Sequence, residues 1–337
     1  MKVVRTDAEL ELPRVDRALR EAGATLVLLP EMASADDLAL ALRDAELLLM
    51  CYAQIPARII ADAPRLKGIV KYGVGIDAID VEAAKRRGIP VVNIPEYAEE
   101  TVAEGAVALM LALAKKFKPL QREMETRGWA WPTARWLATD LAGKTLGLVG
   151  VGRIGANVAR MAGYGLRMKV LGFDPYVGGD RMARLAVEKC DDLHDMLARC
   201  DVVSVHAVLT TETRHLLGER ELASMRPSAV LVNVSRGAIV DEAALVRALQ
   251  GHRIAGAALD VYGVEPLAQS AHPLSPLYAM DNVLLWPHLT FYTVEAMRRL
   301  EDETLERCFE ILEGRPVLVK SRDPRLRSQS VGVRFSE

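Results

Sequence analysis

Short apolar, β-branched runs alternate with segments of helical periodicity along most of the chain. In the first hundred residues the runs predict strands at residues 2–4, 25–29, 46–50, 68–71 and 91–93. Ser34 is placed to cap one intervening helix, and Asp80 is placed to cap another, which Gly88 would end. Because strands that alternate with helices favour βαβ units, this region predicts a doubly wound parallel sheet of about five strands.

Beyond this region, two long helical patterns enclose a second series of strands. The first covers residues 100–116 and the second covers residues 293–313, stopping at Gly314. The strands between them are expected at residues 145–149, 169–174, 202–206, 229–234, 256–261 and 283–286. A helix capped by Asp241 should cover residues 241–250. Residues 127–140, with Trp129, Trp131 and Trp136, show no period and predict a connecting loop.

This order indicates that one domain is inserted into the other. The fold class expected is α/β, with two doubly wound parallel-sheet domains. Residues 1–99 and 298–337 would form a discontinuous flavodoxin-like domain, and residues 100–297 a Rossmann-type domain. The segment 320–337 is polar and basic without a period, so it is either a flexible tail or an arm docked on the surface.

Composition narrows the function classes. The 337 residues are 50% hydrophobic and 26% charged, with a net charge of −2, which excludes intrinsic disorder and offers no basic field for nucleic acid. No uncharged apolar run reaches the ~18 residues of a membrane span, and the charged start has no signal-peptide core. Four widely spaced cysteines show neither metal-ligand nor disulfide spacing. We expect a cytoplasmic enzyme without a metal.

A glycine-rich turn follows the strand predicted at residues 145–149. Gly150, Gly152 and Gly155 stand in the GxGxxG spacing between that strand and a helical run, and Asp174 ends the next strand. The glycines allow a tight turn, close approach of a pyrophosphate and close helix–strand packing. A carboxylate at Asp174 would accept hydrogen bonds from the ribose hydroxyls of NAD and repel the 2′-phosphate of NADP. The turn therefore predicts a dinucleotide site that prefers NAD; a tight turn without a ligand is the alternative.

Three further strand ends carry polar side chains. Arg236, Glu265 and His288 follow strands whose carboxyl ends would meet at one edge of the sheet. Arg236 would bind a substrate carboxylate and polarise the adjacent carbonyl, while His288 would exchange a proton with the carbonyl oxygen. Glu265 would fix the imidazole tautomer and favour its protonated form. His206 also ends a strand, so position alone does not select His288.

The ordered motifs of the chain resemble those of the D-isomer-specific 2-hydroxyacid dehydrogenase family. The matching stretches are KYGVGIDAIDVEAAKRRGIPVVNIP (71–95), TVAEGAVALMLALAK (101–115), LAGKTLGLVGVGRIG (141–155), DVVSVHAVLTTETRHLL (201–217), LVNVSRGAIVDEAAL (231–245), AALDVYGVEPL (257–267) and NVLLWPHLTFYT (282–293). The phosphoglycerate dehydrogenase and C-terminal-binding-protein subgroups are the most similar. The resemblance implies NAD(P)-dependent interconversion of a 2-oxoacid and a D-2-hydroxyacid, with Arg236, Glu265 and His288 as the catalytic set.

The same resemblance assigns cofactor and substrate contacts. Arg153 and Ile154 would touch the pyrophosphate, and Asp174 the adenine ribose. The nicotinamide would be lined by Val234, Arg236, Asp260 and His288, with further contributions from His206 and Thr101. In the loop Tyr72, Gly73, Val74 and Gly75, backbone N–H groups would receive the substrate carboxylate. Family members pair as homodimers through the cofactor domain; the tryptophans of residues 129–136 would serve dimer or core packing, or cross to the partner.

Two departures from the family pattern bear on the substrate and on the class of function. The stretch at residues 50–56 lacks the arginine that phosphoglycerate-type members use for the substrate phosphate, although Lys71 and Arg135 offer other cations. Phe291 and Tyr292 stand where many members have glycines, which favours a small or flat substituent. The leading hypothesis is a 2-oxoacid reductase, and the alternative is an NAD-sensing scaffold that recruits protein partners.

Overall fold

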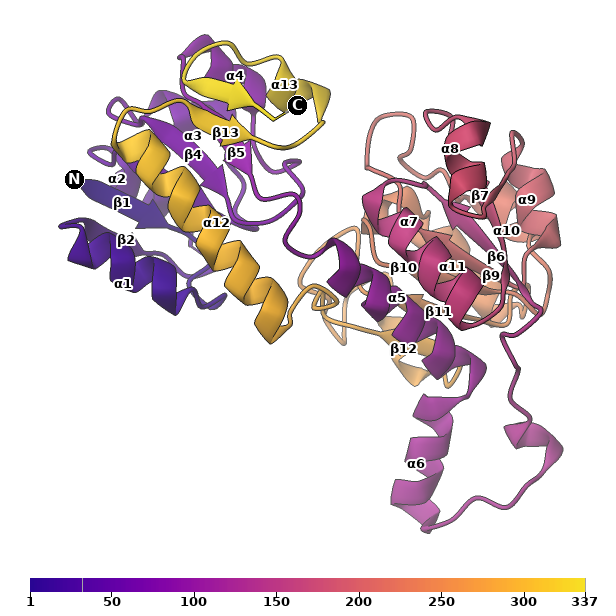
Figure 1. The fold of residues 1–337 in the computed structure, drawn as a ribbon. Coiled ribbons are helices and arrows are strands. Elements are labelled where there is room, and N and C mark those ends of the chain that lie inside the picture. Colours follow the sequence, from indigo (N-terminus) through magenta and orange to yellow (C-terminus); the bar gives the residue numbers. More distant parts are fainter. Residues whose placement is uncertain (32, 337) are drawn as a thin grey trace. The chain divides into compact units, whose positions relative to one another are not determined.

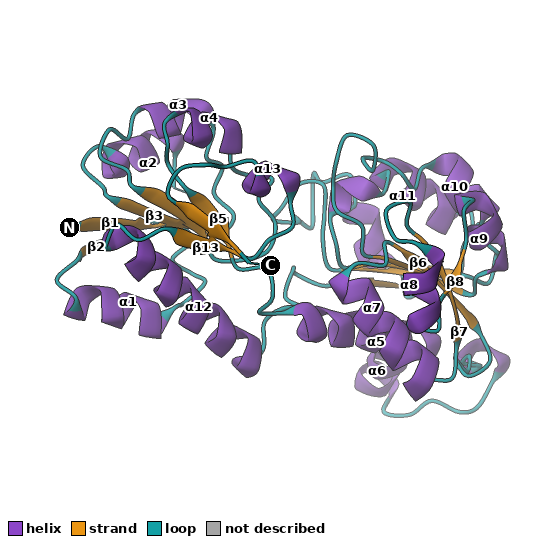
Figure 2. Ribbon diagram, turned by 45° about the horizontal axis from the view of Figure 1, so that its top comes forward, coloured by secondary structure: helices purple, strands orange, loops and turns teal. Residues whose placement is uncertain are grey.

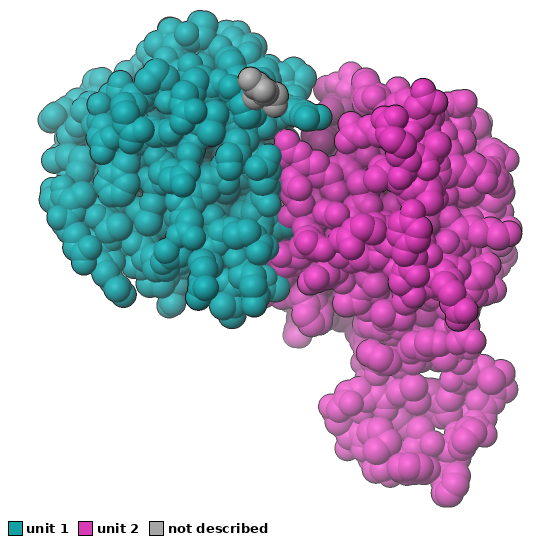
Figure 3. All heavy atoms as spheres, viewed as in Figure 1, with its two compact units in different colours: residues 1–98, 293–337 teal, residues 99–292 magenta. Residues whose placement is uncertain are grey.

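The computed structural model describes residues 1–31 and 33–336, and the chain divides into two compact units. Unit 1 comprises residues 1–98 and 293–337, and unit 2 comprises residues 99–292 (Figure 3). Both units are built on parallel sheets covered by helices, so the predicted α/β class is confirmed. Among the described residues, no helix combines the length and the apolar composition that crossing a membrane requires.

Unit 1 contains a five-stranded parallel sheet in the order β2-β1-β3-β4-β5. Its strands are β1 (Lys2–Arg5), β2 (Thr25–Leu28), β3 (Leu47–Met50), β4 (Gly68–Lys71) and β5 (Val91–Asn93). One face carries α1 (Pro13–Glu21) and α12 (Val294–Leu312), and the other carries α2 (Ala35–Leu42), α3 (Ala57–Ala61) and α4 (Val81–Arg86) (Figures 1 and 2). Ser34 and Asp80 cap α2 and α4 through the amides of Asp37 and Ala83, as predicted.

The C-terminal segment of unit 1 is an arm docked on the domain. It contains β13 (Val317–Val319), α13 (Pro324–Arg327) and β14 (Val333–Phe335), and the two strands pair in parallel. The Gln329 side chain accepts a hydrogen bond from the Val91 N–H at 2.7 Å and donates one to the Val91 carbonyl at 2.9 Å. These bonds attach the segment to the edge strand β5. The segment is therefore an arm docked on the surface and not a flexible tail.

Unit 2 contains a seven-stranded parallel sheet in the order β12-β11-β10-β9-β6-β7-β8. Its strands are β6 (Thr145–Val149), β7 (Lys169–Phe173), β8 (Glu188–Lys189), β9 (Val202–Val205), β10 (Val230–Asn233), β11 (Gly256–Leu259) and β12 (Val283–Leu285). The sequence pattern predicted all of these except the two-residue β8. The helices are α5 (Glu99–Ala114), α7 (Arg153–Arg160), α8 (Gly179–Arg184), α9 (Leu193–Arg199), α10 (Glu219–Ser224) and α11 (Glu242–Gln250), with α5 and α7 packed together (Figure 1).

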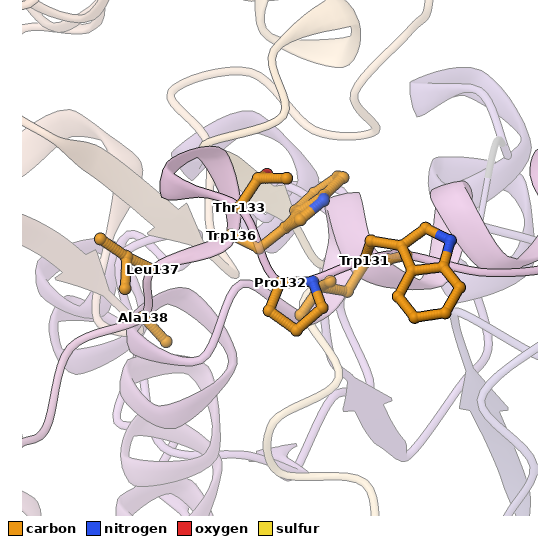
Figure 4. Close-up of a pocket in the computed structure, with 8 residues that line it drawn as sticks. Trp131, Pro132, Thr133, Trp136, Leu137 and Ala138 are labelled. Carbon is orange, nitrogen blue, oxygen red and sulfur yellow. The ribbon is translucent and has the colours of Figure 1, made fainter.

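A helical arm projects from the rest of unit 2 (Figures 1 and 3). It consists of α6 (Phe117–Arg127) and a loop that contains the short 3₁₀ helix η1 (Ala134–Trp136). The sequence pattern did not predict α6. No residue of α6 is buried, and Trp129 and Trp131 are 59% and 74% exposed. The expectation that these two tryptophans pack in the core of the chain is therefore wrong. Trp131 and Trp136 line a shallow pocket within the arm that contains none of the predicted site residues (Figure 4).

Candidate active site

The candidate residues of unit 2 follow the carboxyl ends of its strands. The strand β6 lies between β7 and β9, so the chain leaves β6 toward one side and later returns on the other. In open parallel sheets, ligands bind at such a reversal, outside the carboxyl ends of the strands. The glycine-rich turn follows β6, His206 follows β9, Arg236 follows β10, Asp260 follows β11 and His288 lies beyond β12.

The three glycines of the turn are required for different steric reasons. Gly150 has φ +94°, and a Cβ there would lie 2.6 Å from the Ala207 backbone nitrogen. A Cβ at Gly155 would lie 2.4 Å from the Gly150 carbonyl oxygen, so α7 can start against the turn only with glycine there. Gly152, the N-cap of α7, faces open space within 4 Å. That space adjoins the N–H groups of the first turn of α7, which have no partner within the helix and attract a phosphate.

Asp174 lies directly beyond β7 and is bonded to the same turn. Its Oδ2 accepts a hydrogen bond from the Val151 N–H at 2.9 Å, and its Oδ1 accepts one from the Tyr176 N–H at 2.9 Å. A carboxylate can accept about four hydrogen bonds, so each oxygen retains capacity for a hydroxyl. This donor and acceptor set fits a dinucleotide with a ribose diol and a pyrophosphate.

The other predicted cofactor residues differ in their surroundings. Arg153 donates a hydrogen bond to Glu99 at 3.0 Å, and Ile154 is half-buried on α7. Val234 and Thr101 are both 7% exposed. The imidazole Nε2 of His206 lies 2.8 Å from the Ser204 hydroxyl, and burial lowers the pKa of His206 to about 3. His206 is therefore neutral at physiological pH and unsuited to donate a proton.

His288 and Glu265 form the central pair of the candidate site. The Nδ1 atom of His288 lies 2.8 Å from Oε2 of Glu265, and the two side chains are 26% and 30% exposed. The other carboxylate oxygen, Oε1, accepts a hydrogen bond from the Tyr262 N–H at 2.9 Å. The ring of Phe291 also contacts the imidazole, edge to face, with centroids 6.3 Å apart. The imidazole is thus held by both Glu265 and Phe291.

The electrostatics of Glu265 favour its ionised form. Burial acts to raise its pKa, but the hydrogen bond and charge of His288, the Tyr262 amide and the charge of Arg236 together lower the pKa below the ordinary glutamate value. A carboxylate that stays ionised holds the Nδ1 proton of His288 in place and stabilises positive charge on the ring. Acid–base exchange with a substrate therefore falls to Nε2.

Arg236 is positioned by the turn after β10. The Asn233 side chain donates a hydrogen bond to the Arg236 carbonyl at 2.9 Å, and the Arg236 guanidinium donates one to the Ser235 carbonyl at 2.7 Å. A Cβ at Gly237 would lie 1.9 Å from the Tyr262 carbonyl carbon. Only glycine lets this turn touch the segment that leads to Glu265. The structure thereby brings the Arg236 and Glu265 segments together.

The site contains Asp260, which was singled out from the sequence, and Gly237, Tyr262 and Thr290, which were not. Asp260, expected beside the nicotinamide, is fully buried and accepts hydrogen bonds from the N–H groups of Leu289 and Thr290. Tyr262 donates a hydrogen bond to the Trp286 carbonyl at 2.7 Å and so connects the segments after β11 and β12. Gly237 could have been identified from the sequence, since it follows Arg236 directly. Tyr262 and Thr290 had no such signal, because the bonds that join them to Trp286 and Asp260 span more than twenty residues.

In unit 1, the predicted substrate loop follows β4. Gly73 has φ +154°, and a Cβ there would lie 2.9 Å from Nζ of the buried Lys71. The Gly73 carbonyl accepts a hydrogen bond from the Ile94 N–H at 3.0 Å, and the Val74 carbonyl accepts one from the Asn93 side chain at 2.5 Å. Within the described residues, the N–H groups of Val74 and Gly75 donate to no protein acceptor. Tyr72 is fully buried and donates a hydrogen bond to the Thr6 carbonyl at 2.5 Å, so its hydroxyl is structural.

The two additional cations considered for a substrate anion are engaged elsewhere. Nζ of Lys71 donates a hydrogen bond to the Cys51 carbonyl at 2.6 Å. Arg135 lies over the Trp136 ring, 4.4 Å from its centroid, in the arm of unit 2. Within the part of the chain that the structure describes, no group of three histidine, cysteine, aspartate or glutamate side chains is arranged to hold a metal ion.

Comparison with known proteins identifies relatives along most of the chain. Residues 107–290 match the model of the D-isomer specific 2-hydroxyacid dehydrogenase, NAD binding domain. The chain is 40% identical over 262 residues to glyoxylate reductase of Korarchaeum cryptofilum, covering 77% of each. It is 37% identical over 274 residues to D-3-phosphoglycerate dehydrogenase of Methanocaldococcus jannaschii, covering 81% of this chain and 51% of that protein. This chain thus spans about half the length of several curated relatives that it matches.

Solved structures with a similar fold also include a 2-hydroxyacid dehydrogenase. The structure of D-lactate dehydrogenase from Aquifex aeolicus, complexed with NAD and lactic acid, superposes with a TM-score of 0.83 at 30% identity, covering 93% of this chain and 96% of that one. The match covers both units and includes the insertion of the second sheet between the two parts of unit 1. The sequence and structural matches agree, and the chain belongs to the D-isomer-specific 2-hydroxyacid dehydrogenase family.

Proposed function

We propose that the protein is an NAD-dependent D-2-hydroxyacid dehydrogenase that acts chiefly as a 2-oxoacid reductase. The observation that carries the proposal is the 2.8 Å hydrogen bond between His288 Nδ1 and the ionised Glu265, at the carboxyl edge that also holds the glycine-rich turn. Because Nδ1 is bonded to Glu265, Nε2 of His288 is the ring nitrogen that can exchange a proton with a substrate. Family membership and the NAD-binding domain match support NAD as the cofactor.

In the proposed mechanism, the side chains handle the substrate's charge and its proton. NADH, when bound, supplies the hydride that reduces the carbonyl carbon. His288 donates a proton from Nε2 to the carbonyl oxygen, and in the oxidative direction takes it back. Arg236 binds the carboxylate and the carbonyl oxygen through its planar fork, which polarises the carbonyl. Glu265 stays ionised and stabilises the imidazolium.

The cofactor contacts belong to the same proposal. The pyrophosphate would lie over Gly152 against the first turn of α7, beside Arg153 and Ile154. Asp174 would accept hydrogen bonds from the adenine ribose hydroxyls, which favours NAD over NADP. The nicotinamide would be bordered by Val234, Arg236, Asp260 and His288, with His206 and Thr101 as further contributors.

We propose a small, unphosphorylated 2-oxoacid as the substrate class. The turn after β3 carries no arginine, and the nearby ammonium of Lys71 is buried against the Cys51 carbonyl. Phe291, 7% exposed, packs against His288, and Tyr292 packs against Phe291; this bulk favours a small or flat substituent. Among the relatives, glyoxylate reductase of Korarchaeum cryptofilum is 40% identical to this chain and is matched over 77% of its own length.

The test is NADH oxidation with glyoxylate, pyruvate, hydroxypyruvate, 3-phosphohydroxypyruvate and 2-oxoglutarate, for wild type and His288→Ala. Wild type should reduce at least one small acid, and the variant should lose ~100-fold or more of kcat. His194→Ala is the matched control, because His194 also pairs with a carboxylate, at 3.3 Å from Glu221, but lies on α9. Failure of every acid together with tight NADH binding would favour the NAD-sensing scaffold, although the named relatives are enzymes.

We also propose that the protein is a homodimer formed through unit 2. The arm of α6 and residues 128–140 exposes apolar side chains that a monomer would leave in water, including Phe117, Trp129, Trp131 and Leu137. Light scattering should give twice the mass of one chain. The double variant Trp131→Ser/Leu137→Ser should shift the mass toward one chain, and an unchanged mass would remove the arm from the interface.

We also propose that the protein is cytoplasmic, because its four cysteines are free thiols. All four are buried, and no disulfide joins them. The measurement is fractionation of the native cells, in which the protein should accompany cytoplasmic marker enzymes.

A further inference from the structure

The backbone of His288 has an unusual conformation for a residue with a side chain. Its φ is +57°, in the left-handed region that a Cβ disfavours. Such a conformation persists only where the surroundings hold it, and functional sites are where it is common. Contacts around His288 must therefore hold its backbone in the left-handed conformation.

The two residues after His288 are tied to the end of β11. Oδ1 of Asp260 accepts a hydrogen bond from the Leu289 N–H at 2.9 Å. Oδ2 of Asp260 accepts one from the Thr290 N–H at 3.2 Å and a shorter one from the Thr290 hydroxyl at 2.6 Å. Because Asp260 is fully buried at the strand end, these three bonds fix the turn that carries His288 to the sheet.

Thr290 is confined from the other side by a helix. A Cβ placed on Gly105, in α5, would lie 2.7 Å from Cβ of Thr290 and 2.8 Å from its Cγ2. The backbone of α5 therefore packs directly on the Thr290 side chain. Thr290 has little room to change rotamer, and its hydroxyl stays directed at Asp260.

From this arrangement we infer that Thr290, held between Gly105 and Asp260, is a positioning residue that keeps His288 in its left-handed conformation with Nδ1 at Glu265. Thr290 acts through His288. The inference rests on the proposed function, since proton transfer by His288 is the step that this positioning serves. A misplacement of about 1 Å at a reacting group can slow turnover ~100-fold.

The first test is the Thr290→Val variant, which keeps the shape of the side chain and removes the hydroxyl. Its kcat for the best 2-oxoacid should fall at least about tenfold, while the NADH dissociation constant stays within about threefold of wild type. Its solvent deuterium isotope effect on kcat should rise, because proton transfer from a displaced imidazole becomes slower. Thr290→Ser, which keeps the hydroxyl, should restore most of the turnover. A valine variant with wild-type kcat, or a serine variant as impaired as valine, would overturn the inference.

A second variant covers the case in which Thr290→Val does not fold. Gly105→Ala pushes on Thr290 from α5 while improving helix propensity, so the loss of kcat should appear without a loss of helix. Gly163→Ala is the matched control, because its Cβ would meet Val170 at an ordinary 3.6 Å. Equal kcat in both glycine variants would contradict the inference.

The proposed function and this inference can fail separately. If wild type reduces no 2-oxoacid, the proposed function falls, and the inference is decided by crystal structures of wild type and Thr290→Val. A change of the His288 φ out of the left-handed region, or loss of its bond to Glu265 in the variant, would support it. An unchanged His288 would refute it.

Discussion

Gly152 and Gly155 offer a test that separates the stability of the glycine-rich turn from its use as a phosphate site. A Cβ on Gly155 would lie 2.4 Å from the Gly150 carbonyl oxygen, about 1 Å inside ordinary contact. Since both atoms belong to backbone, the overlap can be relieved only by moving α7. Gly152 has φ −73°, and a Cβ there would meet nothing within 4 Å.

The two substitutions should therefore have opposite profiles. Gly155→Ala should destabilise the protein by ~1–3 kcal/mol, the usual cost of overpacking, and lower Tm by several degrees. Gly152→Ala should cost at most ~0.5–1 kcal/mol, the order of a weakened N-cap. Its added methyl would fill the space that a pyrophosphate must enter, so NADH affinity should fall at least about tenfold, or ~1.4 kcal/mol.

The assay is thermal unfolding without cofactor, followed by titration with NADH monitored by protein fluorescence. Gly218→Ala is the control, because Gly218 is also an N-cap glycine with an extended backbone, but it begins α10. It should leave NADH affinity unchanged. Wild-type NADH affinity in Gly152→Ala, or wild-type Tm in Gly155→Ala, would refute the steric reasoning.

Three further predictions concern single side chains. Arg236→Lys should raise KM for the 2-oxoacid and lower kcat, because an ammonium cannot reproduce the planar fork; unchanged kinetics would remove Arg236 from its role. Asp174→Ala should narrow the preference for NADH over NADPH in kcat/KM, and an unaltered ratio would contradict the ribose assignment. The lowered pKa of Glu265 contributes stability above the unfolded-state value of about 4.3 and loses it as pH falls through the folded value. In urea unfolding, Glu265→Gln should therefore be less stable than wild type near pH 7 and approach it in acid; a gap that widens in acid would be the contrary result.

The strands of the two large sheets, apart from β8, and the helices α2, α4, α5, α11 and α12 were predictable because their signals are local. A parallel strand buried on both faces is typically a short apolar run, and a helix often begins at a side chain that can accept one of its first N–H bonds. β4 and β5 were therefore predicted with their observed bounds, and Ser34 and Asp80 were identified as caps. The helix α6 was missed because it buries no residue and so has no apolar stripe facing a core.

The candidate site was partly predictable for a topological reason. Carboxyl ends of parallel strands meet at one edge, so Arg236, Glu265 and His288 could be grouped before any coordinates. The contacts that hold these three side chains in place could not be predicted. Gly237 against Tyr262, and Thr290 between Asp260 and Gly105, join segments that share no local pattern.

The amino-acid sequence by itself determined the order of strands and helices, the α/β class and the chemical groups at the strand ends, because each follows from neighbours a few residues apart. Only the tertiary structure decided that the C-terminal segment docks on β5 through Gln329, and that His206 is a neutral, half-buried histidine while His288 faces a carboxylate. Those outcomes depend on desolvation and on hydrogen bonds between distant segments. Such energies exist only once the chain is packed.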